Sequence, residues 1–134
     1  MNRALLCSAI EEVVSRYGYE FYLNDKSYYP TVVCRYPAAF MSYPEFVAME
    51  GQKHGRITYK VSLRLACQGA KLSASERNAL LDEMEKTIVN MFVAISQEEQ
   101  IAVVKELTIS PCSGTIDEHG AVVIEATAKV ETIF

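Results

Sequence analysis

The hydrophobic residues of this chain recur at two spacings, one typical of helices and one typical of strands. Over residues 2–17 the spacings of four, three and four place Leu6, Ile10, Val13 and Tyr17 on one side of a helix. Gly18 suits the C-terminus of that helix, because glycine adopts positive φ at little cost. A second helix is predicted to begin after the capping-box pair Ser73 and Glu76, with the buried stripe Leu80, Met84, Ile88, Met91, Phe92 and Ile95.

Alternation of hydrophobic and other residues predicts the strands. The longest run is 57–68, in which Ile57, Tyr59 and every second residue after them face inward, while Lys60, Arg64 and Ala66 face outward. Shorter segments with strand composition occur at 31–35, 38–42, 45–50, 103–110 and 121–134. The last two are close enough in sequence to pair as an antiparallel hairpin.

The order of these elements predicts the fold class. Two amphipathic helices need an apolar surface to cover, and one face of the sheet supplies it. We expect an α+β fold with a mainly antiparallel sheet and both helices packed on one face. No linker or low-complexity tract interrupts the pattern, so we expect residues 1–134 to form a single domain.

Composition and charge narrow the class of protein. Half of the 134 residues are hydrophobic and 22% are charged, which is ordinary for a globular domain. A formal net charge of −4 argues against a dedicated nucleic-acid-binding protein. No apolar run approaches the roughly 20 residues of a membrane-spanning helix, and the N-terminal residues lack the pattern of a signal peptide. We expect an intracellular protein that binds neither nucleic acid nor membrane.

No motif of the sequence predicts catalysis, a metal site or a cofactor. Phosphate-binding glycine loops, H-E-x-x-H and G-x-S-x-G are absent. The cysteines at 7, 34, 67 and 112 form no C-x-x-C pair, so buried, reduced thiols are expected. Asp117, Glu118 and His119 are adjacent in a predicted turn, where neighbouring side chains point apart and form no poised acid–base pair. A thiol enzyme using Cys34 remains a hypothesis.

A basic turn stands out in this acidic chain. Residues 51–56 (GQKHGR) join the segment 45–50 to the long strand. If these two strands extend past the body of the domain, the turn is an exposed basic tip; otherwise it is an ordinary hairpin loop. The candidate contact residues are Lys53, His54 and Arg56 of the turn, and Lys60 and Arg64 of the outward strand face, for which a solvated surface is the alternative.

Tyr-Pro occurs three times, at Tyr29-Pro30, Tyr36-Pro37 and Tyr43-Pro44, with a period of seven residues. Seven is odd, so successive pairs on one continuous strand would face opposite sides. Proline removes a backbone donor and favours an extended preceding residue, so the pairs are predicted to mark corners and edges of short strands. Exposed edges invite pairing with a neighbouring chain, which adds Tyr29, Tyr36 and Tyr43 to the candidate contacts.

The order of elements resembles a known family. An N-terminal helix, a proline-punctuated extended segment, the strand YKVSLRLACQ, the helix opened by SASERNALLDEMEKTIV and a final alternating hairpin are similar to the tail terminator, or tail completion, proteins of long-tailed bacteriophages and prophages. The resemblance extends over nearly the whole chain and rests on pattern, without a diagnostic motif.

The resemblance implies a structural virion protein without catalysis. Proteins of this family assemble into a ring, typically a hexamer, that caps the tail tube and meets the head-tail connector. The chain would then occupy the bacterial cytoplasm during assembly and the virion tail afterwards, and 51–56, Lys60 and Arg64 would be contact positions. Segment 28–50 also has the aromatic and methionine enrichment of an interface core. The alternative is an α+β module that binds a small molecule or peptide between this tyrosine-rich segment and the sheet.

Overall fold

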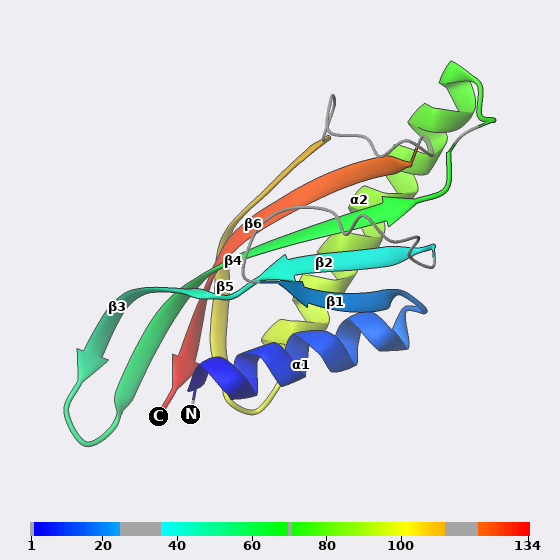
Figure 1. Ribbon diagram of the computed structural model, residues 1–134. Helices are drawn as coiled ribbons and strands as arrows, with labels where there is room; N and C mark the ends of the chain where they lie inside the picture. Colours follow the sequence, from blue (N-terminus) through cyan, green and yellow to red (C-terminus); the bar gives the residue numbers. More distant parts are fainter. Residues whose placement is uncertain (1, 25–35, 70, 112–120) are drawn as a thin grey trace.

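The computed structural model describes residues 2–24, 36–69, 71–111 and 121–134 (Figure 1). Several sequence predictions lie outside the described residues: the strand at 31–35, Tyr29 with Pro30, Cys34, Cys112, and the Asp117-Glu118-His119 group.

Both predicted helices are confirmed. Helix α1 spans Asn2–Arg16 and helix α2 spans Ala74–Ser96. Gly18 ends α1 with φ of 82°, as expected. At the start of α2, the backbone N–H of Glu76 donates to Ser73 Oγ (3.2 Å) and that of Ser73 donates to Glu76 Oε1 (3.1 Å), which completes the predicted capping box. None of the helices in the described ranges has the length and apolarity needed to cross a membrane.

The strands form one mixed sheet that is mainly antiparallel. They are β1 (Glu20–Asn24), β2 (Ala38–Ser42), β3 (Glu45–Gly51), β4 (Gly55–Cys67), β5 (Ile101–Pro111) and β6 (Val122–Ile133). Their order is β1-β2-β4-β6-β5, with β3 also paired to β4. Strand β6 pairs with all of β4 except its first residue, and β5–β6 is the predicted hairpin. Strand β1 was not predicted, because its extended conformation depends on parallel pairing with β2 rather than on a local sequence pattern.

Strands β2 and β3 lie one after the other along the same edge of β4. Strand β2 pairs with residues 63–66 of β4, and β3 pairs with residues 55–60. Tyr43 and Pro44 separate the two strands, and the cis peptide Tyr36-Pro37 directly precedes β2. The prediction that the Tyr-Pro pairs mark strand corners is therefore confirmed for the two pairs within the described residues.

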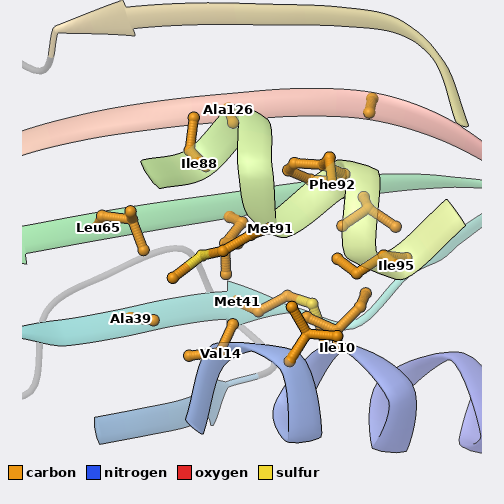
Figure 2. Close-up of a cluster of buried hydrophobic side chains, with 14 of the residues drawn as sticks. Ile10, Val14, Ala39, Met41, Leu65, Ile88, Met91, Phe92, Ile95 and Ala126 are labelled. Carbon is orange, nitrogen blue, oxygen red and sulfur yellow. The ribbon is translucent and has the colours of Figure 1, made fainter. Parts of the chain in front are cut away.

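Both helices cover the same face of the sheet, which confirms the predicted α+β arrangement. Side chains of α1, α2 and the sheet meet in one buried cluster (Figure 2). Its largest fully buried members include Leu6 and Ile10 of α1, Ile88, Met91 and Phe92 of α2, and Met41, Leu63, Leu65 and Ile124 of the sheet.

Two predictions of burial are wrong. Tyr17 is 42% exposed rather than buried, because α1 ends at Arg16 and Val14 takes the core position instead. Ala66 was expected to face water but is buried on the sheet face opposite to the helices, against Ala38, Phe40, Ala121 and Val123. Ala66 does point to the outer face, as the alternation predicts. An alternating pattern cannot reveal that other residues bury the outer face at this point.

A projecting hairpin as the candidate contact surface

The hairpin formed by β3 and the first residues of β4 (residues 45–60) extends past the body of the molecule. Figure 1 shows it reaching beyond α1, at the end where both termini lie. Every residue of β3 is exposed. The sheet follows the hairpin to its turn, since β6 pairs with residues 56–60 of β4 and the backbones of Gly55 and Phe134, beside the turn, exchange hydrogen bonds of 3.2 and 3.0 Å. The hairpin is thus an extension of the main sheet, and its strand β3 is left uncovered by both described helices.

The turn at its tip depends on two glycines. Gly51 has φ of 117°, a conformation that other residues rarely adopt. A Cβ at Gly51 would collide with the carbonyl oxygen of His54, and one at Gly55 with the carbonyl oxygen of Glu50. The tip residues Gln52, Lys53 and His54 are all exposed. The conditional prediction of an exposed basic tip is therefore confirmed in its geometry.

A β-bulge sets which side chains the hairpin presents. Phe46 lies opposite Tyr59 and Met49 opposite Ile57, with the register shift between Phe46 and Ala48. Without a bulge, residues three apart would face opposite sides of the strand. With it, Phe46 and Met49 share the face of Ile57 and Tyr59, which is the core face of the sheet. They remain 57% and 53% exposed, and Val47 is 46% exposed.

The root of the hairpin is anchored on Tyr59, which is only 5% exposed. The ring of Phe46 meets the Tyr59 ring edge-on, and the guanidinium of Arg3 lies 5.6 Å from the centre of the Tyr59 ring. Arg3 Nε also donates a hydrogen bond of 3.2 Å to the carbonyl oxygen of Pro44. The first turn of α1 therefore fixes the corner from which the hairpin leaves the body.

The outer face of the sheet carries paired charges. Arg56 and Lys105 both contact Glu131, at 3.1 and 2.6 Å, and hydrogen bonds from these two cations lower the pKa of the Glu131 carboxyl. Arg64 pairs with Glu125, and Lys129 pairs with Glu106. Arg56 and Arg64 thus have partners within the chain, and their role as contact residues stays a prediction. Among the described residues Lys60 has no ion-pair partner, and it is exposed.

The two described tyrosine candidates lie beyond opposite ends of β2. Tyr43 is 51% exposed at the corner between β2 and β3. Tyr36, before the other end of β2, is half-buried against the outer cluster of Ala38 and Phe40, and its role as a contact residue stays a prediction. Tyr29 lies outside the described residues.

Some exposed hydrophobic residues were missed among the candidate contacts. Phe46, Val47 and Met49 belong to a segment with interface composition, but strand periodicity alone could not show that the helices stop short of them. On α2, Val89 and Val93 are 41% and 51% exposed, four residues apart, on the side away from the buried stripe. Two valines among the polar residues of an otherwise amphipathic helix were the available signal.

The described thiols are poorly suited to nucleophilic chemistry. Burial raises the pKa of both Cys7 and Cys67, which disfavours their thiolate forms at neutral pH. Cys67 Sγ lies 3.6 Å from the hydroxyl of Tyr19, whose pKa is also raised by burial. Within the described ranges, no three His, Cys, Asp or Glu side chains are grouped so that they could hold a metal ion.

No protein-family model matches this chain, and no curated protein matches it. The resemblance to phage tail terminators therefore stays a prediction from sequence pattern.

Proposed function

We propose that this chain is a self-assembling structural protein of the tail-terminator type, which forms a ring on the end of a phage tail tube and contacts the head-tail connector. The observation that carries the proposal is the projecting hairpin, with Phe46, Val47 and Met49 each about half exposed. Monomeric proteins seldom leave adjacent large apolar side chains in water, and contiguous exposed patches of this kind mark interaction surfaces.

Burial of these side chains would stabilise a complex. Full burial of a large apolar side chain contributes about 1.5–3 kcal/mol. Each of these three side chains is already about half buried, so burying the rest of it in a complex would contribute about 1 kcal/mol. Three such residues would contribute about 3 kcal/mol at the centre of an interface, and further contacts would have to supply the rest of the binding free energy.

The edge of β3 supports the same proposal. Strand β3 pairs with β4, and none of the other described strands pairs with its outer edge. Edge strands are usually protected by charges, prolines or covering loops. Here the protecting charges Glu45 and Glu50 lie near the ends of β3, while its central residues are apolar.

The oligomeric state of the purified protein tests the proposal. Sedimentation velocity and negative-stain microscopy are expected to show closed rings, either alone or on added phage tail tubes. Phe46→Asp with Met49→Asp should abolish them, whereas Leu5→Asp, at a 48% exposed site on α1, should not. A wild-type chain that stays monomeric at its highest attainable concentration and does not bind tail tubes would contradict the proposal. So would a gene neighbourhood without portal, tube or tape-measure genes.

A further inference from the structure

The outward side of α2 has features complementary to the hairpin. Val89 and Val93 form its exposed apolar part, and Asp82 lies on the same side of the helix because it precedes Val89 by seven residues. Glu83 is exposed as well, but it directly follows Asp82 and therefore lies about 100° farther around the helix, off this side. Lys86 is also on this side, but α2 as a whole has four acidic residues against two basic ones.

The charges of the two surfaces are available for a partner. Within the described part of the chain, Lys53 belongs to no ion pair, and neither do Asp82 and Glu83; the cations Arg56, Arg64, Lys105 and Lys129 all do. The hairpin thus joins an apolar face to an unpaired cation at its tip. The outward side of α2 joins an apolar pair to the carboxylate of Asp82, with Lys86 one turn farther along.

The distance from the apolar residues to the charged residue is about the same on the two surfaces. From Phe46 to Gly51 the strand advances about 17 Å, at about 3.3 Å per residue. From Val93 to Asp82 the helix advances about 16 Å, at 1.5 Å per residue. When Phe46 is placed on Val93, the tip of the hairpin therefore lies at the acidic residues of α2.

These surfaces cannot meet within one molecule. Figure 1 shows α2 beginning at the end of the molecule opposite to the hairpin turn. We infer that the hairpin of one subunit docks on α2 of a second copy, with Phe46 and Met49 against Val89 and Val93 and with Lys53 beside Asp82. This inference rests on the proposed ring and specifies its contact. Because two different surfaces meet, the contact is head-to-tail and can be repeated around a ring.

A mixing experiment tests this contact. One variant, Phe46→Glu with Met49→Glu, loses the hairpin surface, and a second, Val89→Glu with Val93→Glu, loses the α2 surface. All four positions are exposed, so both variants should keep the near-ultraviolet circular dichroism of the wild type; glutamine at the same positions provides a second pair of variants. Each variant alone should be monomeric. An equimolar mixture should form a heterodimer that grows no further, since one intact surface remains on each subunit.

Other outcomes would overturn the inference. If the α2 variant assembles as the wild type does, the contact is wrong while the proposed ring stands. If both variants are monomeric but the mixture forms no heterodimer, the hairpin surface does not bind the α2 surface and the head-to-tail contact is wrong. If the wild-type chain neither self-associates nor binds tail tubes, the proposed function fails and the contact fails with it.

Discussion

Phe46 meets Tyr59 edge-on, with ring centroids 6.2 Å apart and an interplanar angle of 88°. One ring is buried and the other is mostly in water, so this pair connects the core of the molecule to its most exposed strand. The two residues should respond differently to substitution, which separates folding from assembly.

Tyr59→Ala should destabilise the fold by about 3–4 kcal/mol, because it leaves a cavity and removes the contacts of Phe46 and Arg3. Phe46→Ala should cost about 1 kcal/mol or less, since that ring is 57% exposed, yet it should weaken self-association. Urea denaturation monitored by circular dichroism measures the first effect and sedimentation the second. Equal destabilisation by the two substitutions would show that the hairpin is part of the cooperative core.

Gly51→Ala should destabilise the tip of the hairpin by about 1–3 kcal/mol, because alanine at positive φ is strained and its Cβ meets backbone atoms. Gly18→Ala is the matched control. Gly18 also has positive φ, but a Cβ there meets nothing within 4 Å, so about 1 kcal/mol is expected. Thermal denaturation of both variants provides the comparison, and a larger loss at Gly18 would contradict this account of the turn.

The Glu131 carboxyl should make stability depend on pH. Its pKa is lowered in the folded chain by hydrogen bonds from Lys105 and Arg56. The stabilisation is therefore complete above the unfolded pKa of about 4.3 and is lost as the pH falls through the lower folded value. Glu131→Gln should flatten this part of the urea-midpoint profile, whereas Glu83→Gln, which removes an unpaired carboxylate, should not. A profile unchanged by Glu131→Gln would show that the pair contributes nothing to stability.

Charge reversal should test the proposed meeting of the hairpin tip with α2. Lys53→Glu should weaken self-association by up to about tenfold, because an attractive pair becomes a repulsive one. Adding Asp82→Lys to the same chain should restore most of the affinity at low salt, with the gain falling as salt rises. Lys71→Glu, at an exposed lysine outside both surfaces, is the control. If Asp82→Lys fails to rescue Lys53→Glu, these two side chains do not meet in the assembled protein.

Sequence periodicity predicted most of the fold, because each helix and long strand buries only one side. Ser73 and Gly18 were predicted from local backbone chemistry, and that chemistry operates unchanged in the folded chain. Strand β1 and the burial of Ala66 were missed, since both depend on which segment packs against them. Burial of this kind comes from tertiary structure rather than from local pattern.

The sequence predicted where the exposed turn lies, but not which hairpin side chains are paired within the chain or which share a face. The glycine-flanked turn correctly indicated an exposed tip at Lys53 and His54. Arg56 and Arg64 were chosen for their charge, but their partners Glu131 and Glu125 lie 75 and 61 residues away in sequence, so pairing could not be foreseen. The face shared by Phe46 and Met49 depends on a bulge, and strict alternation places them on opposite faces.

The open edge of β3 also determines how its amide hydrogens exchange with solvent. In an antiparallel pair, alternate residues point their N–H groups toward the partner strand, so on either side of the bulge every second amide of β3 faces away from β4. These amides should exchange fast in the isolated chain, in a period-two pattern that is interrupted at the bulge between Phe46 and Ala48. Docking of the hairpin by its side chains would leave that pattern intact. Addition of a neighbouring strand would erase it, so the exchange pattern of one seven-residue strand distinguishes the two modes of assembly.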